Sequence, residues 1–353
     1  MPKTYRIAVI PGDHIGPEVI GAGLTVLHAL DDRGVCCFQF ETFPWGAGHF
    51  LETGRAAPED VAERLRPFDA IYFGAHGRPG EVPDRISSRQ LMHPIRKGLD
   101  LYVNLRPARL WPGVQSPLKD PGEIDLVVVR ENTEGEYSGI GGQLHVGTPN
   151  ELAILSTVVT RRGAERLMRF AFDLARKRRK YVHCVTKSNA LALVMQLWDD
   201  TFCRVAADYP DVRTSQSHVD AMSMYVITRP ATFDVVVATN LMGDIVSDEA
   251  AAVTGSIGLA ASANLDPERR GPSLFEPIHG SAPDIAGKGV ANPLATIGAA
   301  ALMLDWLGEA EAAQRVQHAI EAVLSDGRVR TPDLGGSAST DDMTRAVIGC
   351  LGE

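Results

Sequence analysis

The sequence lacks the glycine-rich signatures of the commonest nucleotide-binding folds. Its 353 residues contain neither a GxGxxG segment nor a GxxxxGK[ST] segment. Both kinds of loop hold phosphates with closely approaching backbone amides. A conventional Rossmann or P-loop phosphate site is therefore excluded.

Cysteine is scarce, and its pattern excludes a disulfide framework. The cysteines are odd in number, form no CxxC pair and follow no signal-like segment: Cys36, Cys37, Cys184, Cys203 and Cys350. Disulfide scaffolds and zinc ribbons need paired, regularly spaced cysteines. We therefore expect a reducing, cytoplasmic environment.

Positive charge is in deficit, and no apolar stretch is long enough for a membrane. There are 35 Lys and Arg against 44 Asp and Glu, a net charge of −9. This balance argues against a protein that binds nucleic acid or a membrane surface. The most apolar tract, residues 294–307, follows a proline and contains Asp305. It predicts a buried helix and not a membrane span.

Short apolar segments alternate with segments of helical spacing along the whole chain. Strands are expected near residues 5–10, 70–74, 101–105, 126–130, 153–159, 181–186 and 235–238, and helices near 18–30, 162–177, 191–207, 221–228, 244–253, 293–307, 310–324 and 340–351. Such alternation predicts an α/β fold with a mostly parallel central sheet.

The segment VVVATNLMGDIVSDEAA, beginning at Val235, reads as a buried strand, a turn and a helix. Asp244 and Asp248 stand four residues apart, so one helical face carries both carboxylates. Hard oxygen ligands suit Mg²⁺ or Mn²⁺. The alternative is that these acidic residues only complement the helix dipole.

Three arginines occupy positions that favour anion binding. Arg106 and Arg130 each follow a predicted strand, and Arg96 lies on a helical segment before the first of them. Arginines at strand ends can meet in the crevice at the carboxyl edge of a sheet. Guanidinium groups pair with carboxylates through two hydrogen bonds, so together these arginines predict a pocket for a substrate with at least two carboxylates. Taken singly, each fits a surface ion pair.

Tyr137 and Lys187 are candidates for proton transfer. Lys187 directly follows a predicted buried strand, where desolvation can lower the pKa of a lysine. A tyrosine can donate its proton to a developing carbanion. A salt-bridge role for Lys187 and a packing role for Tyr137 remain the alternatives.

The polar segment of residues 275–293 is too glycine-rich and long to be a simple turn. Gly280, Ser281 and Ala282 are small enough for their backbone amides to approach an adenine nucleotide. Asp284 could hold two ribose hydroxyls and would repel a 2′-phosphate. We therefore expect NAD and not NADP.

Together these segments resemble the β-decarboxylating dehydrogenase family of isocitrate, 3-isopropylmalate, homoisocitrate and tartrate/D-malate dehydrogenases. The resemblance runs from PGDHIGPE at residues 11–18 to TPDLGGS at 331–337 and includes NLMGDIVSD at 240–248 and EPIHGSAPD at 276–284. RENTEGEYSG at 130–139, TKSN at 186–189, ANLDPER at 263–269 and PSLFEP at 272–277 bring it closest to the tartrate/D-malate branch.

The resemblance implies a two-domain fold like that of isopropylmalate dehydrogenase. Residues 1–101 and 255–353 would form a large cofactor-binding domain, and residues 102–254 a small domain with the dimer interface and the metal and substrate residues. The homodimer would share its active sites, because Lys187 and Asp220 would reach across from the partner subunit.

The resemblance also implies an activity, namely oxidation and decarboxylation of a (2R)-malate-type hydroxy acid. Arg96, Arg106 and Arg130 would bind carboxylates, Lys187 and Tyr137 would move protons, and Asp220, Asp244 and Asp248 would hold Mg²⁺ or Mn²⁺. NAD would contact His279, Asp284 and Asn292 with its adenosine half and Ile15, Glu276 and Asn189 near its nicotinamide.

The chain departs from the family pattern at several positions. His14 stands where the family usually has glycine, and His76 stands where the tartrate branch has valine; local packing is the favoured explanation for both. In SSRQLMHPIR at 87–96, helical spacing predicts Arg89, His93 and Arg96 on one face.

This cationic face leaves alternative functions open. It suggests a substrate with an extra anionic arm, such as isocitrate, homoisocitrate, a 3-isopropylmalate-type acid or a phosphono analogue. A packed His93 with Arg89 in solvent is the plain alternative. A further alternative function is that of a catalytically silent regulatory paralogue. The sequence argues against it, because all the side chains that the reaction is expected to need are present.

Overall fold

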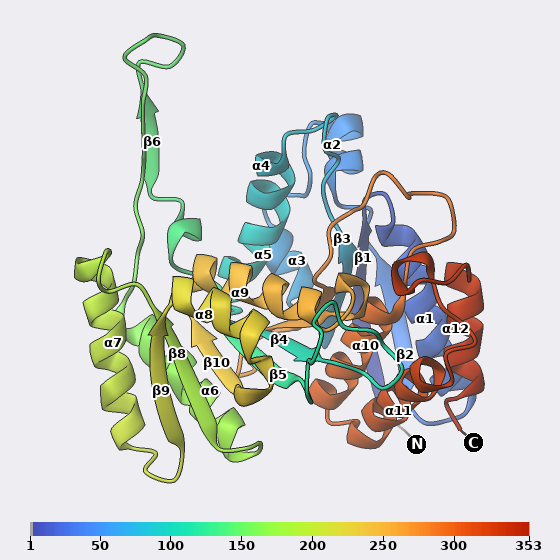
Figure 1. The fold of residues 1–353 in the computed structure, drawn as a ribbon. Coiled ribbons are helices and arrows are strands. Elements are labelled where there is room, and N and C mark those ends of the chain that lie inside the picture. Colours follow the sequence, from blue (N-terminus) through green and yellow to red (C-terminus); the bar gives the residue numbers. More distant parts are fainter. Residues whose placement is uncertain (1–2, 353) are drawn as a thin grey trace.

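The β-branched segments of the sequence form the strands of one sheet. In the computed structural model, which describes residues 3–352, ten strands lie in the order β2-β1-β3-β12-β11-β4-β5-β10-β8-β9 (Figure 1). Their bounds are β1 Thr4–Gly12, β2 Cys37–Thr42, β3 Ala70–Ala75, β4 Val103–Arg109, β5 Asp125–Glu131, β8 Tyr181–Thr186, β9 Arg213–His218, β10 Val235–Ala238, β11 Ala261–Leu265 and β12 Ser273–Pro277.

Strand direction changes only in the middle of the sheet. Neighbouring strands run parallel in both outer parts. At the centre, β11 pairs antiparallel with β12 and β4, and β4 pairs antiparallel with β5. The predicted α/β class with a mostly parallel sheet and no GxGxxG turn is confirmed.

Helices cover the sheet (Figure 1). Helices α1, α10, α11 and α12 pack together beside β1, β3, β11 and β12, whereas α6, α8 and α9 pack on β4, β5, β8 and β10. The longer helices are α1 Gly16–Asp32, α6 Arg161–Arg176, α7 Ala192–Ala207, α8 Val219–Thr228, α9 Asn240–Val253, α10 Leu294–Leu307, α11 Ala310–Asp326 and α12 Thr340–Gly349. Shorter helical segments are α2 Ala47–Thr53, α3 Val61–Leu65, α4 Asp84–Ser87, η1 Ser88–Met92, α5 His93–Gly98, η2 Glu136–Ser138, η3 Pro230–Thr232, η4 Ile257–Leu259 and η5 Pro332–Leu334.

The strand order separates the middle of the chain from its two ends. Strands from residues 1–101 and 255–353 fill one side of the sheet as far as β11, and strands from residues 102–254 fill the other side from β4 onward. The division into a large and a small domain at these residues stays a prediction. The sheet itself is continuous across the junction.

The predicted tract at 294–307 is helix α10, and most of its residues are buried. This agrees with the prediction of a core helix. No helix within residues 3–352 combines the length and the apolarity needed to cross a bilayer.

One predicted strand lies outside the sheet. Residues 152–155 form β7 (Leu152–Leu155), which pairs with β6 (Gly141–Leu144) in a separate antiparallel hairpin. Both strands are exposed along their whole length, and the hairpin extends away from the body (Figure 1). The strand predicted at 153–159 is therefore present only in part, and it does not belong to the central sheet, because an apolar run does not specify the surface that will cover it.

Candidate functional site

Two arginines lie side by side on one face of the central sheet. Arg106 is opposite Val128 in the β4–β5 pair, and Arg130 is opposite Asn104. Residues two apart on a strand share a face, so Arg106 and Arg130 are diagonal neighbours. The prediction that they meet is confirmed, but its reason is wrong. Arg106 lies inside an antiparallel strand and not at the carboxyl edge of a parallel pair.

Helix α9 places its polar residues against these arginines. Arg106 Nη1 donates to Asp244 Oδ1 (2.9 Å), Ser247 Oγ (2.8 Å) and Asp248 Oδ1 (3.2 Å). Arg130 Nη1 donates to the same oxygen of Asp244. The predicted convergence of the arginines and the two carboxylates is therefore present within one chain.

Asn240 contacts Arg130, and the sequence did not predict this contact. Its Oδ1 accepts from Arg130 Nε (3.0 Å) and Arg130 Nη2 (2.8 Å) at the start of α9. Gly243 lets the helix come this close, because a Cβ there would lie 2.8 Å from Arg130 Cβ. A polar residue in the first turn after a buried strand was the available signal.

The charges of this cluster shift the pKa values of its members. Burial opposes ionisation of Asp244, but Arg130 and Arg106 hold its pKa below the usual value. Burial raises the pKa of Asp248, and the charge of Asp244 adds to that effect. Burial beside Arg106 lowers the pKa of Arg130. The pKa values of Asp244 and Asp248 are thus shifted in opposite directions although both residues lie on one face of the helix.

Tyr137 reaches the same cluster from the segment after β5. Its hydroxyl donates to Asp244 Oδ2 (3.3 Å). Burial and then the charge of Asp244 raise the pKa of Tyr137, so the phenol stays protonated at neutral pH. Lys97 Nζ donates to the carbonyls of Tyr137 and Ser138, both at 2.8 Å, and thereby fixes this segment.

Arg96 lies on α5 and faces Glu276 of β12. Arg96 Nη2 donates to Glu276 Oε1 (3.0 Å), which also accepts from Asn264 Nδ2 (2.7 Å). The Nε atoms of Arg96 and Arg106 are buried and have no partner within residues 3–352. Unpaired buried donors of this kind are costly unless an acceptor binds them.

One cavity of about 310 Å³ joins these groups. Its polar wall carries both predicted substrate-binding and predicted cofactor-binding residues, namely His76, His93, Arg96, Arg106, Arg130, Tyr137, Asp244, Glu276, His279 and Gly280. Asp248 lines another cavity, of about 580 Å³, with Ser256 and Asp333 on its walls. The two carboxylates of α9 therefore line different cavities.

The prediction that Arg89, His93 and Arg96 share one face holds only in part. His93 and Arg96 line the arginine cavity, but Arg89 is exposed and lines a third cavity together with His93, Lys97 and Tyr137. The reason is η1, a π-helical turn with more residues per turn than an α-helix. Four-residue spacing therefore does not align side chains there.

His93 and His76 are held neutral. Burial and then Arg96 lower the pKa of His93 to about 4, and the ring lies edge-on to Tyr137 at 5.9 Å between centroids. Burial lowers the pKa of His76, whose Nδ1 lies 3.3 Å from Ser87 Oγ. The expectation that local packing explains His76 is incomplete, because its side chain lines the cavity.

His14 lies at a strained backbone position where the family usually has glycine. Its φ is +51°, in the left-handed region that costs energy for residues with a Cβ. Its Nε2 is buried without a partner in the described part of the chain. The neighbouring Ile15 is buried, and its N–H donates to Ser281 O (3.1 Å), which ties this turn to the predicted cofactor segment.

The predicted cofactor residues differ in their availability. The carboxylate of Asp284 is exposed, and His279 Nε2 is a buried donor or acceptor without a partner within residues 3–352. Ser281 is buried, and Ala282 has a φ of +43°. The Asn292 side chain donates to Asp333 Oδ2 (2.9 Å) and accepts from Leu294 N (3.0 Å). These two contacts hold the Asn292 side chain in place.

Lys187, Asn189 and Asp220 lie away from the cavity of their own chain. Lys187 Nζ donates to Asp220 Oδ1, and this contact lowers the pKa of Asp220. Asn189 is exposed beside Lys187. None of the three lines the arginine cavity.

The donor set fits a hard divalent cation only in part within one chain. Asp244 and Asp248 offer carboxylate oxygens on one helical face, as Mg²⁺ and Mn²⁺ prefer. No group of three or more His, Cys, Asp or Glu side chains in the described residues is placed to hold a metal ion. Asp244 and Asp248 are therefore the two carboxylates that this part of the chain offers to such a cation.

Comparisons with known proteins show the family of the chain. A family model described as isocitrate/isopropylmalate dehydrogenase matches residues 6–347. The chain is 48% identical over 350 residues to a probable tartrate dehydrogenase/decarboxylase of Bacillus subtilis, covering 99% of this chain and 98% of that protein. It is 49% identical over 356 residues to the decarboxylating D-malate dehydrogenase of Escherichia coli, covering 98% of each.

A solved structure extends the likeness to the whole fold. The crystal structure of isocitrate dehydrogenase from Methylococcus capsulatus superposes with a TM-score of 0.90 at 38% identity, covering 99% of this chain and 100% of that one. The chain therefore belongs to the isocitrate/isopropylmalate dehydrogenase family and is a decarboxylating dehydrogenase.

Proposed function

We propose that the protein oxidises and decarboxylates a (2R)-malate-type hydroxy acid, tartrate or D-malate, with NAD as hydride acceptor and Mg²⁺ or Mn²⁺ as bound cation. The observation that carries the proposal is the cavity in which Arg96, Arg106 and Arg130 face Asp244. The names of the B. subtilis and E. coli relatives support the choice of substrate.

The arginines bind and orient the substrate. Arg96 and Arg106 keep buried Nε donors free, and guanidinium groups recognise carboxylates through paired hydrogen bonds. A diacid held at both ends presents its C2 hydroxyl and its C3 carbon to the remaining groups. Such orientation lowers the activation free energy because it removes translational and rotational freedom beforehand.

Asp244 and Asp248 would hold the cation, with Asp220 of the partner subunit as the third carboxylate. A bound divalent cation supplies electron withdrawal at the C2 oxygen of the substrate. Arg106 contacts both carboxylates of this chain and fixes their orientation. Lys187 would accompany Asp220 from the partner subunit, so a complete site requires a homodimer.

Two side chains move the protons. Lys187 accepts the proton of the C2 hydroxyl as the hydride leaves C2. Tyr137, held as a phenol by burial and by Asp244, donates its proton to the carbon that has lost CO₂. Lys97 keeps Tyr137 in place through the two carbonyl contacts.

The cofactor segment fits a dinucleotide without a 2′-phosphate. NAD supplies a nicotinamide ring that accepts the hydride. Glu276, which we expect near the nicotinamide, lines the arginine cavity and would place the nicotinamide end there. The exposed carboxylate of Asp284 would face the ribose hydroxyls and repel a phosphate.

Steady-state assays with a panel of hydroxy acids test the proposal. We expect NADH production with D-malate or tartrate, its loss in the presence of a chelator, and its return when Mn²⁺ is added in excess. Absence of turnover for every acid of the panel would overturn the proposed function.

A substrate with an additional anionic arm is a second candidate. The third cavity, which adjoins the arginine cavity through His93 and Tyr137, is lined by Arg89 and Lys97. Arg89 has no hydrogen-bond or ion-pair partner within residues 3–352. Faster turnover of isocitrate or homoisocitrate than of D-malate in the same panel would favour this candidate.

A further inference from the structure

A series of hydrogen-bonded side-chain amides crosses the sheet where its two sides meet. Asn264 of β11 donates from Nδ2 to Glu276 Oε1 (2.7 Å). Its Oδ1 accepts from Asn104 Nδ2 (3.2 Å) and from Asn132 Nδ2 (2.9 Å). Asn264 therefore touches side chains from β12, β4 and the end of β5.

These hydrogen-bonded amides lie on the same face of the sheet as Arg106 and Arg130. Asn104 is paired directly with Asn264 on one side and with Arg130 on the other. Arg106 lies two residues beyond Asn104 on β4, so its side chain shares that face. On this face of the sheet, the amides thus lie between Glu276 and the arginine pair.

Burying these amides in the sheet is costly for the fold. Asn104 and Asn264 are completely buried, in strands that otherwise supply the core. The Oδ1 atoms of Asn104 and Asn132 have no donor within residues 3–352. Each buried acceptor without a donor costs about 1–3 kcal/mol, so a role outside folding is the better explanation.

The amides connect two sets of proposed substrate ligands. Glu276 holds Arg96 (3.0 Å) on the side of the sheet built from both chain ends. Arg106 and Arg130 lie on the side built from the middle of the chain. Asn264 hydrogen-bonds to Glu276 on its own side of the sheet and to Asn104 and Asn132 on the other side.

We propose that Asn264 is a positioning residue that sets the separation between Arg96 and the Arg106/Arg130 pair, and so the length of diacid that the site accepts. This inference rests on the proposed function, because it assumes that these arginines bind the two ends of the substrate. Asn264 itself touches neither substrate nor cofactor.

The first test compares Asn264→Leu with Ser273→Ala. Ser273 is also completely buried, on the neighbouring strand β12, but within residues 3–352 its hydroxyl oxygen accepts only from the backbone N–H of Asp266 (3.2 Å). We expect KM for the preferred acid to rise about tenfold to hundredfold in Asn264→Leu, and the preference for that acid over longer or shorter diacids to shrink. Ser273→Ala should lower the melting temperature and leave KM and the preference unchanged.

The second test exchanges the amide and the carboxylate. Asn264→Asp loses the donor to Glu276 and places two carboxylates in contact. The double variant Asn264→Asp/Glu276→Gln restores one donor and one acceptor between the two positions. We expect its kcat/KM to exceed that of Asn264→Asp, and this comparison remains available if Asn264→Leu does not fold.

The outcomes separate the inference from the proposed function. If the wild-type protein turns over no hydroxy acid, the proposed function fails and the inference with it. If the wild-type protein is active but Asn264→Leu keeps its KM and substrate preference, or the double variant regains nothing over Asn264→Asp, the positioning role is wrong while the proposed function stands.

Discussion

Removing a single atom, the phenol oxygen of Tyr137, tests the proposed proton transfer. Tyr137→Phe removes the proposed proton donor and leaves the arginines in place. We expect steady-state kcat to fall by about 10²–10⁴-fold, the usual contribution of a general acid. Hydride transfer in a single turnover, followed as NADH absorbance, should stay within a few-fold of the wild-type rate because oxidation precedes the protonation step.

Tyr209→Phe is the matched control for Tyr137→Phe. Tyr209 also donates its hydroxyl to a carboxylate, Asp173 (3.0 Å), but it lies among core residues outside the cavities. Its loss should leave kcat unchanged. An unchanged kcat in Tyr137→Phe, or an equal loss of hydride transfer, would contradict the proton-donor role.

The lowered pKa of His93 predicts that the stability of the fold depends on pH. Its pKa in the folded state is about 4, below the ordinary value of 6.5, so unfolding favours protonation. This contribution to stability is present above pH 6.5 and is lost as the pH falls toward 4. The melting temperature of the wild-type protein should therefore fall more between pH 7 and pH 4.5 than that of His93→Leu.

His93→Leu also tests the contact with the substrate. If the ring meets a polar or anionic arm, the variant should change the ranking of the hydroxy acids in the assay panel. An unchanged ranking together with a parallel pH dependence of the two melting temperatures would show that His93 is neither a specificity residue nor the buried neutral group described here.

Asp284 governs the proposed cofactor preference. Asp284→Lys replaces a charge that repels a 2′-phosphate with one that attracts it. We expect the ratio of kcat/KM for NAD to that for NADP to fall about tenfold or more, which corresponds to ~1.4 kcal/mol. A ratio that stays constant would remove Asp284 from the cofactor site.

The charged residues of the cavity could be predicted from the sequence, and the asparagines that support them could not. Arg106, Arg130 and Asp244 stand next to buried strands, where an uncompensated charge is costly and therefore informative. Asn240 and Asn264 carry no charge, and single asparagines occur in many turns. Their contacts become visible only through the strand register.

Gly243 gives a prediction at the scale of an element, the approach of α9 to β5. Gly243→Ala would place a Cβ 2.8 Å from Arg130 Cβ, so α9 must shift. We expect a loss of stability of about 1–3 kcal/mol and a lower kcat/KM, because Asp244 moves relative to the arginines.

Gly21 on helix α1 is the control for this substitution. A Cβ at Gly21 would meet no atom within 4 Å. Gly21→Ala should therefore stabilise the protein by about 0.5–1 kcal/mol through helix propensity and leave the kinetics alone. Equal behaviour of the two variants in denaturant unfolding would contradict the close-packing argument.

Elements with continuous apolar or strongly periodic sequences agree with their predictions. Strand β10 and helix α11 lie within two residues of the expected bounds, and strand β8 matches them. Strands β2 and β9 were missed because they lie at the sheet edges and are polar and partly exposed. The π-turn η1 was missed because α-helical spacing was assumed there.

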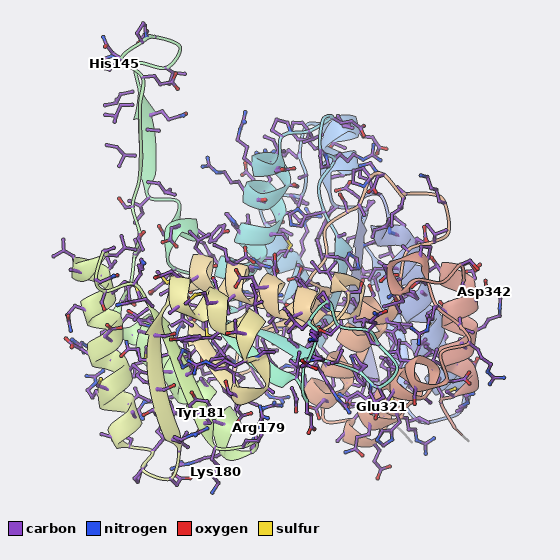
Figure 2. All side chains as sticks on the ribbon, in the orientation of Figure 1. His145, Arg179, Lys180, Tyr181, Glu321 and Asp342 are labelled. Atoms are coloured by element: carbon purple, nitrogen blue, oxygen red, sulfur yellow. The ribbon has the colours of Figure 1, made fainter. Side chains whose placement is uncertain are left out.

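At the scale of the whole molecule, much apolar surface has no cover within one chain. Exposed large apolar residues gather on the hairpin β6–β7 and on α8 and α9, including Ile154, Leu155, Met224, Ile227 and Ile245. Figure 2 shows the hairpin standing clear of the body, with His145 at its far end. Apolar patches of this kind mark protein–protein interfaces, which supports the proposed homodimer.

Resemblance to a family is the only ground on which the sequence predicts Asp220 as a site residue and assigns Lys187 to the site of a partner subunit. Within one chain they bind each other and do not line the arginine cavity. Neither periodicity nor spacing can reveal a residue that acts in a neighbouring subunit. This part of the site is the one that most needs an experiment.

Subunit complementation tests the central claim most directly, namely that one site combines the arginine–Asp244 cavity of one chain with Lys187 of another. Lys187→Ala and Asp244→Asn should each be inactive. Dimers formed from both variants by co-expression contain one intact site in each mixed dimer, so about a quarter of all sites should recover wild-type activity. Recovery to that level is the predicted result. A mixture no more active than its parents, although mixed dimers are present, would contradict the account.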